Sequence, residues 1–309
     1  MKTANPNRVN YSIGLVVFLG VILMVSFADN DAQASMPSPG QRVVLVTGST
    51  GGLGREVARS LGRQGDHVIV HGRNEERGRA LVGEIEAEGK GSARFYRADF
   101  GSLREVRDLA DSIIEDYERL DVLVNNAGIF NPDQQERRVS EDGYELHFQV
   151  NYLAGYVLTR MLTPLLESSA PGRIINVASG QRPIDFDDLM LETDYDGMQA
   201  YFQSKNAQIM MTFSMADELA ARGITINAMH PSNLMNTDMV IEAGFEPVTP
   251  VETGRDALVR LVNEDVGTGK FFNVFEEAEA IPQAYDAGAV ARLMKVTEEL
   301  VAKSIGDRD

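Results

Sequence analysis

Cysteine and tryptophan are both absent from this 309-residue sequence, and histidine occurs only four times. Without cysteine the chain forms no disulfide bond, carries no thiol nucleophile and offers no thiolate ligand to a metal. The histidines lie at positions 67, 71, 147 and 230, and this spacing matches no zinc-binding pattern, so we predict no metal site. These absences exclude thiol catalysis and argue against a metalloenzyme.

Positive charge is also scarce, because 29 Lys and Arg stand against 46 Asp and Glu and give a formal net charge of -17. A nucleic-acid partner requires clustered Lys and Arg, so we predict none. An acidic, solvated surface is the simpler interpretation of the charge. The length and the 43% hydrophobic content are those of a globular protein with one large α/β domain or two small ones.

One long uncharged run lies near the N-terminus, between Tyr11 and Phe27. Basic residues precede this run, and a small-residue Ala-x-Ala site at 32–34 follows it, an order typical of a secretory signal peptide. The run is also long enough to remain as a membrane anchor. We therefore expect residues 1–40 to be a signal peptide or membrane anchor plus linker, and residues 41–305 to be the folded domain, either exported or anchored to a membrane.

The first segment of that domain is a β-branched run at 43–46, which predicts a strand buried on both faces of a parallel sheet. Gly48, Gly52 and Gly54 follow, before a predicted helix over 52–61. Glycines let main-chain N–H groups approach an anion at the helix N-terminus, where the macrodipole adds roughly half a positive charge. We interpret this turn as a phosphate cradle, with an ordinary β-to-α turn as the alternative.

Strand-like and helix-like segments alternate along the rest of the chain. Strands are predicted at 67–71, 93–98, 121–124, 173–178, 224–229 and near 270–274, and helices at 75–88, 103–117, 140–166 with Ser140 as its N-cap, 199–221, 251–262 and 285–303. This order predicts a single-domain, Rossmann-type, doubly wound parallel α/β fold. Residues 180–198 and 232–250 lack periodicity and are expected to form loops over the substrate, at the carboxyl ends of the strands where ligands bind.

The end of the second predicted strand bears on the choice of dinucleotide. In such folds an acidic residue about 20 positions beyond the glycines binds the ribose 2′-hydroxyl of NAD, whereas a nearby Arg accommodates the 2′-phosphate of NADP. Gly72 stands where the acid would lie, and Arg73 follows it. The sequence therefore favours NADP over NAD, and a merely solvated Arg73 is the alternative.

A candidate catalytic pair lies on the predicted helix over 199–221. Tyr201 and Lys205 are four residues apart, so they share one face. A free phenol has a pKa of about 10, and a neighbouring ammonium is expected to lower it toward the range that suits proton transfer. Ser179 follows the fifth predicted strand and would hydrogen-bond a developing oxyanion. Asn151 would hold a water that connects Lys205 to solvent.

In combination these motifs resemble the short-chain dehydrogenase/reductase family, in its single-domain branch with an Asn-Ser-Tyr-Lys tetrad. The motifs are Thr47-Gly48-x-x-x-Gly52-x-Gly54, Asn125-Asn126-Ala127-Gly128, Asn151, Ser179 and Tyr201-x-x-x-Lys205. The resemblance covers about residues 41–303. It implies catalysis by Asn151, Ser179, Tyr201 and Lys205, with Tyr201 as the proton donor to the substrate, and a homodimer or homotetramer.

The cradle, the argument from Arg73 and the resemblance together predict a set of cofactor-binding residues. The set comprises Gly48, Thr50, Gly52, Leu53, Gly54, Arg73, Asp99, Phe100, Asn126, Ala127, Gly128, Tyr201, Lys205 and Pro231. The resemblance places Asp99 near the adenine and Asn126 near the ribose. Two positions depart from the family pattern, because Ser232 replaces the usual Gly after Pro231 and Thr237 lies one residue further on.

Two loop regions, 187–197 and 269–272, are similar to those of retinol-dehydrogenase-like and WW-domain-oxidoreductase-like members, which act on lipophilic carbonyls and alcohols. We expect an NADP-dependent carbonyl reductase or alcohol dehydrogenase with an apolar substrate. A non-catalytic NAD(P)-binding sensor or scaffold is the alternative. An exporting leader conflicts with a cytoplasmic nicotinamide pool, so the side of the membrane stays open.

Overall fold

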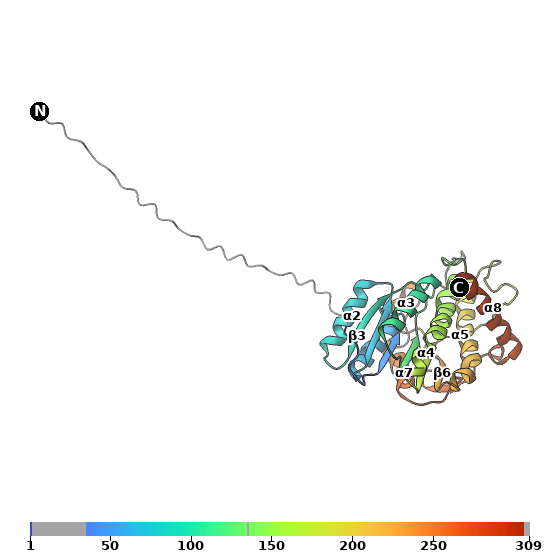
Figure 1. Ribbon diagram of the computed structural model, residues 1–309. Helices are drawn as coiled ribbons and strands as arrows, with labels where there is room; N and C mark the ends of the chain where they lie inside the picture. The colour runs from blue at the N-terminus through green and yellow to red at the C-terminus, as the bar shows by residue number, and fades with distance from the viewer. Residues whose placement is uncertain (2–34, 135, 306–309) are drawn as a thin grey trace. The chain divides into compact units, whose positions relative to one another are not determined.

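A single parallel-dominated sheet lies at the centre of the computed structural model, which describes Met1 and residues 35–134 and 136–305 (Figure 1). Within these residues the strands are β1 (Val43–Val46), β2 (His67–Gly72), β3 (Ser92–Arg97), β4 (Val122–Asn125), β5 (Gly172–Val177), β6 (Ile224–His230), β7 (Lys270–Asn273) and β8 (Glu276–Ala278). Their order is β3-β2-β1-β4-β5-β6-β7-β8, and only β8 is antiparallel to its neighbour. The predicted doubly wound fold is confirmed.

Helices cover both faces of the sheet and enclose two hydrophobic cores. One face carries α1 (Gly52–Gln64), α2 (Glu75–Ala87) and α7 (Val251–Asn263). The other face carries α3 (Leu103–Asp116), the π-helical turn η1 (Phe148–Leu153), α4 (Ala154–Ser168), α5 (Gly197–Ala220) and α8 (Ala287–Ile305). Two short helices, α6 (Asp238–Glu242) and η2 (Pro282–Tyr285), lie in connections.

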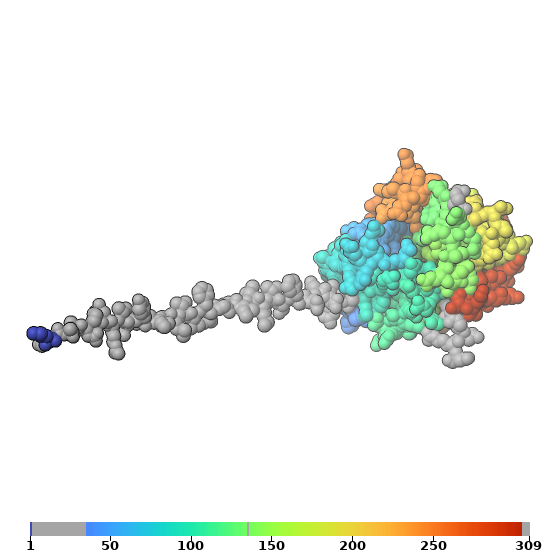
Figure 2. Space-filling model, turned by 90° about the horizontal axis from the view of Figure 1, so that it is seen from above, coloured from blue at the N-terminus to red at the C-terminus, as the bar shows by residue number. Residues whose placement is uncertain are grey.

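Helix α1 shows how the apolar pattern directs this packing. Its buried side chains Leu53, Val57 and Leu61 recur every four residues, so they lie on one face and pack against the sheet and α7. Figure 2 shows the orange residues of the α7 region beside the blue residues of β1 and α1. The helix ends at Gly65, whose φ of 101° is readily adopted only by glycine.

The strand order fixes where the loops of the site meet. Strand β1 is fully buried and lies between β2 and β4, because the chain returns from β3 to the other side of β1. The connections after β1 and β4 therefore leave the sheet in opposite directions and open a crevice at the carboxyl ends. The predicted site residues that follow β1, β2, β4, β5 and β6 all lie at this edge of the sheet.

The structure corrects the prediction of one long helix that begins at Ser140. The Ser140 hydroxyl instead accepts the N–H of Tyr144 at 3.1 Å, and the Gly143 φ of 84° closes a turn there. The chain then passes through the π-helical turn Phe148–Leu153 before α4 begins. The region 232–250, to which no pattern was assigned, contains the short helix α6.

The predicted signal peptide or anchor falls mostly at 2–34, outside the described residues, and stays a prediction. In the described part of the chain, no helix combines the length and apolar character required to cross a membrane.

Candidate active site

The glycine turn after β1 packs main chain directly against the loop after β4. Gly48 has a φ of +65°, and a Cβ added to it would lie 2.7 Å from the Ala127 Cα. A Cβ at Gly54 would lie 2.5 Å from Asn126 Nδ2. Gly51 caps α1 without a side chain, so the first N–H groups of the helix receive no side-chain partner from the cap. This open helix N-terminus fits a phosphate group.

Thr47 fastens the loop after β4 to this turn. Its hydroxyl accepts the N–H groups of Asn126 and Ala127, each at 3.0 Å, and Asn126 Nδ2 donates to the Thr47 carbonyl at 2.8 Å. Asn125 Nδ2 donates to Asn176 Oδ1 at 2.8 Å and ties β4 to β5. The two asparagines therefore join neighbouring strands.

His71 belongs to the cofactor side of the site, although the sequence did not indicate it. Its Nε2 faces the Ala98 carbonyl at 3.2 Å, and its Nδ1 accepts the Gly48 N–H at 3.2 Å. The ring stacks on Phe100 with centroids 4.4 Å apart. Burial lowers the pKa of His71 to about 4, so the neutral ring holds the first glycine of the cradle.

At the end of β2, packing leaves no room for the acidic residue that would bind the ribose 2′-hydroxyl of NAD. A Cβ added at Gly72 would lie 2.5 Å from Thr50 Cγ2, so no carboxylate fits at the end of β2. The side chain of Arg73 is 66% exposed, and its guanidinium lies 3.7 Å from the Asp99 carboxylate. Arg77, which the sequence did not single out, places its guanidinium within 3.9 Å of a Cβ added at Gly51. Two cationic groups therefore lie near the crevice.

The remaining predicted cofactor residues lie at different depths. Leu53 and Pro231 both pack on Gly254 of α7, which places them at the same edge of the crevice. Thr237 lies 3.5 Å from a Cβ added at Gly52, so the segment after β6 reaches the glycine turn despite its altered spacing. The Phe100 side chain is 4% exposed and packs in the core, so only its main chain is available to a ligand.

Buried neutral His71 predicts acid sensitivity. Between pH 7 and pH 5 we expect it to lower the free energy of unfolding by about 2 kcal/mol, because the unfolded histidine binds a proton below its ordinary pKa of about 6.5. In the folded protein its pKa is about 4, so the contribution is full above pH 6.5 and is lost as the pH falls toward 4. Urea unfolding at both pH values, compared with His71→Gln, isolates this term; equal losses in both proteins would contradict it.

Tyr201 and Lys205 project from the first half of α5 toward the carboxyl ends of β4 and β5. The Tyr201 ring is half-buried, and the Ser179 side chain after β5 is close enough to its phenol to lower the pKa of that group. Lys205 Nζ lies 5.9 Å from the centroid of the Tyr201 ring. The ammonium donates to the Val177 carbonyl at 2.9 Å and to Gln208 Oε1 at 3.0 Å. The structure thus brings the serine, tyrosine and lysine together.

Asn151 lies in η1 and joins two further parts of the site. Its Oδ1 accepts the Ile129 N–H at 2.8 Å, and its Nδ2 donates to the Ile129 carbonyl at 3.2 Å and to Ser204 Oγ at 3.0 Å. Ser204 in turn donates to the Tyr201 carbonyl at 2.7 Å. Both amide hydrogens of Asn151 are therefore used, and one lone pair of Oδ1 remains for a water.

The direction of the Tyr201 pKa shift is opposite to our expectation. Burial raises the pKa of this phenol, and the nearby Ser179 side chain lowers it by less. The reason is visible in the packing, because the rings of Phe130, His147 and Phe202 surround the phenol while Lys205 is engaged by Val177 and Gln208. Burial also lowers the pKa of Lys205 to about 7.

Aromatic side chains form an apolar wall beside the phenol. The Phe130 ring packs 4.4 Å from the Tyr201 ring and stacks on Phe245 at 5.8 Å, centroid to centroid. Phe130 also lines an open cavity of about 250 Å³ with residues 131–134, 242 and 243. The wall therefore joins the loop after β4 to the segment after β6, which is the region expected to receive the substrate.

Comparison with known proteins decides the family. The family model for short chain dehydrogenase matches residues 42–246, which is more than half of the chain. The chain belongs to this family. Human retinol dehydrogenase 14 (Homo sapiens) is 33% identical over 292 residues, with 84% of this chain and 86% of the relative covered. Mouse polyprenol dehydrogenase (Mus musculus) is 36% identical over 245 residues, with 76% and 72% covered.

A solved member of the family carries its cofactor. The crystal structure of a short chain dehydrogenase of Escherichia coli CFT073 complexed with NADPH has a TM-score of 0.63 and 27% identity, with 76% of this chain and 97% of that chain covered. The chain with the sequence printed above is thus a short-chain dehydrogenase similar to retinol dehydrogenases, as its loop sequences predicted. It is an NAD(P)-dependent oxidoreductase that acts on CH–OH groups.

Proposed function

We propose that this short-chain dehydrogenase transfers a hydride between NADP(H) and an apolar carbonyl or alcohol, with Tyr201 as the general acid and base. The observation that carries the proposal is the Tyr201 phenol itself. It faces the Ser179 side chain, has the Lys205 ammonium one helical turn away and lies beside an apolar wall. A purely nucleotide-binding protein has no use for this combination.

The preference for NADP rests on the end of β2. Thr50 leaves no room for a carboxylate at Gly72, while the exposed Arg73 guanidinium is available to a 2′-phosphate. The glycine cradle, whose close approaches leave no room for a Cβ at Gly48 or Gly54, suits the pyrophosphate. The NADPH complex of the related Escherichia coli protein is consistent with this preference.

The proposed mechanism assigns each polar group to one atom of the reaction. When bound, NADPH supplies the hydride to the substrate carbonyl carbon. The phenol of Tyr201 gives its proton to the carbonyl oxygen, and its raised pKa keeps it protonated at neutral pH. Ser179 Oγ hydrogen-bonds the same oxygen as negative charge develops. Lys205, anchored by Val177 and Gln208, stabilises the phenolate that remains.

Reprotonation of the phenol is proposed to run through Lys205 and a water held by Asn151. A Cβ added at Gly128 would lie 3.2 Å from Asn151 Oδ1 and 3.4 Å from Lys205 Nζ. Glycine at this position therefore leaves open the space between the two side chains. The pKa of Lys205, lowered by burial to about 7, suits a group that both accepts and releases a proton near neutral pH.

An apolar substrate is supported by the Phe130 and Phe245 wall and by the names of two relatives. Retinol and polyprenols are both unsaturated isoprenoid alcohols. We therefore expect activity with retinal and with prenyl aldehydes, and little with glyceraldehyde.

To test the proposal, the full-length protein in detergent is assayed with a panel of these aldehydes and alcohols. Turnover is measured as the change in NADPH fluorescence. Turnover of apolar members at a kcat/KM at least tenfold above that of glyceraldehyde supports the proposal. NADPH binding without turnover of any member would contradict it. Export or membrane anchoring through residues 11–27 and self-association as a dimer or tetramer remain predictions.

A further inference from the structure

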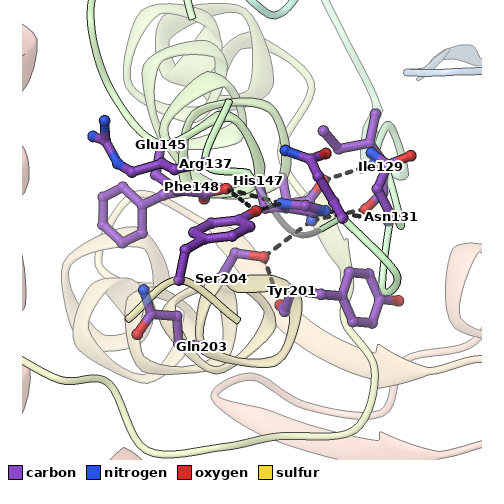
Figure 3. A network of polar contacts seen from close by, with 12 residues as sticks. Ile129, Asn131, Arg137, Glu145, His147, Phe148, Tyr201, Gln203 and Ser204 are labelled. Carbon is purple, nitrogen blue, oxygen red and sulfur yellow. Dashed lines mark hydrogen bonds and ion pairs between the residues drawn. The ribbon is translucent and has the colours of Figure 1, made fainter. Parts of the chain in front are cut away.

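A buried carboxylate and imidazole lie behind the proposed active site, and the mechanism above does not use them (Figure 3). The side chains of Glu145 and His147 are 0% and 1% exposed. The Glu145 carboxylate accepts the Phe148 N–H at 2.7 Å, the His147 Nδ1–H at 2.9 Å and the Tyr195 hydroxyl at 3.2 Å. A carboxylate without water requires donors, and the two shorter bonds, from Phe148 and His147, fix its place.

These contacts fix one tautomer of His147. Its Nδ1 faces the carboxylate and carries the proton, because a carboxylate only accepts. Its Nε2 faces the main-chain N–H of Asn131 at 3.3 Å and must present a lone pair there. In the opposite tautomer two N–H groups would face each other at Asn131, and the Glu145 carboxylate would face a lone pair.

The main chain that His147 holds leads directly to the apolar wall. Asn151 binds both polar atoms of Ile129, and His147 binds the N–H of Asn131, so the segment 129–131 is held on each side of Phe130. Gly197, the first residue of α5, permits this fit, since a Cβ there would lie 2.6 Å from the Asn131 carbonyl. The Phe130 ring then packs on Tyr201 at 4.4 Å.

We propose that Glu145 and His147 are positioning residues for substrate binding. Glu145 holds His147 in its Nδ1–H form, and Nε2 of that form holds the segment 129–131 so that Phe130 forms the wall beside Tyr201. In Figure 3 the Tyr201 ring extends away from this network. The His147 ring lies edge-on to the Tyr201 ring at 6.4 Å, centroid to centroid, but its two ring nitrogens bond Glu145 and Asn131, so the pair acts chiefly through the loop. The inference rests on the proposed function for its kinetic part and on geometry alone for its tautomer.

The decisive variant is Glu145→Gln, which keeps the size of the side chain. The glutamine carbonyl accepts the Phe148 N–H in place of the carboxylate. The glutamine NH2 group then faces His147 Nδ1 as a donor. We expect the proton of His147 to move to Nε2 and the contact with Asn131 to be lost. The loss of one such hydrogen bond is expected to raise KM for the apolar substrate about tenfold. The kcat should change less than threefold and NADPH affinity less than twofold, because the tetrad and the cradle are untouched.

The tautomer is read independently of activity from the ¹⁵N chemical shifts of the four histidines, with His147→Gln for assignment. Tyr195→Phe is the matched control, which keeps the Nδ1–H form and changes KM less than twofold. Phe130→Leu should raise KM with the tautomer unchanged, and it tests the wall even where Glu145→Gln fails to fold.

Three results would overturn the proposal. They are an Nε2–H form in the unaltered protein, an unchanged KM in Phe130→Leu, and a folded Glu145→Gln that keeps both the tautomer and the KM. A protein with no substrate turnover would instead refute the proposed function, and the ¹⁵N spectrum would still decide the tautomer.

Discussion

Tyr201→Phe is expected to lower kcat about a thousandfold, because the only atom removed is the oxygen that exchanges a proton with the substrate. The phenylalanine ring retains the packing with Phe130 and Phe202. The dissociation constant of NADPH should therefore stay within threefold of its original value. Steady-state rates with the best substrate and a fluorescence titration with NADPH measure the two quantities separately.

Tyr195→Phe provides the control for this experiment. It is the same chemical change six residues earlier, at a phenol that faces Glu145 and not the crevice. It should leave kcat within twofold. Activity of Tyr201→Phe within tenfold of the unaltered protein would show that another group transfers the proton.

Arg73→Ala should raise the dissociation constant of NADPH by about 10-fold to 100-fold, the range for a lost hydrogen bond to a charged group. NADH lacks the 2′-phosphate, so its affinity should change less than threefold. The Asp99 carboxylate, 3.7 Å from the guanidinium, loses its partner and adds repulsion against the phosphate. Fluorescence titrations with both nucleotides give the ratio directly.

Arg63→Ala is a suitable control for loss of a surface guanidinium. Arg63 pairs with Glu88 at the end of α1 that lies away from the glycine turn. It should alter neither affinity. Equal losses of NADPH and NADH affinity in Arg73→Ala would mean that this residue does not discriminate between them.

Much of the fold could be predicted because local patterns decide it. The β-branched runs that became β1 and β2 are buried over their whole length, and the apolar residues of α1 and α3 repeat with the helical period. The edge of the sheet on which the motifs lie follows from parallel order alone. Side chains placed by their strand or helix, such as Ser179 and Tyr201, could therefore be located in advance.

The features that were missed depend on contacts between distant segments. His71 reaches the cradle from β2, and the Glu145 and His147 pair depends on Asn131, a residue of the loop after β4. In the π-helical turn at Phe148–Leu153 the hydrogen bonds span five residues instead of the four of an α-helix, a local difference that hydrophobic periodicity does not resolve. The sign of the Tyr201 pKa shift depends on the rings that surround it, and their positions are set by tertiary packing.

The antiparallel strand β8 has a consequence for assembly. It occupies the free edge of β7, so a second copy cannot extend the sheet there by pairing with β7. The strand itself is only three residues long and begins with Glu276 and Glu277, and acidic side chains on a short edge disfavour strand addition. Strand pairing through β7 is therefore closed to a second copy, and this flank of the molecule is protected against the edge-to-edge aggregation to which open sheets are prone.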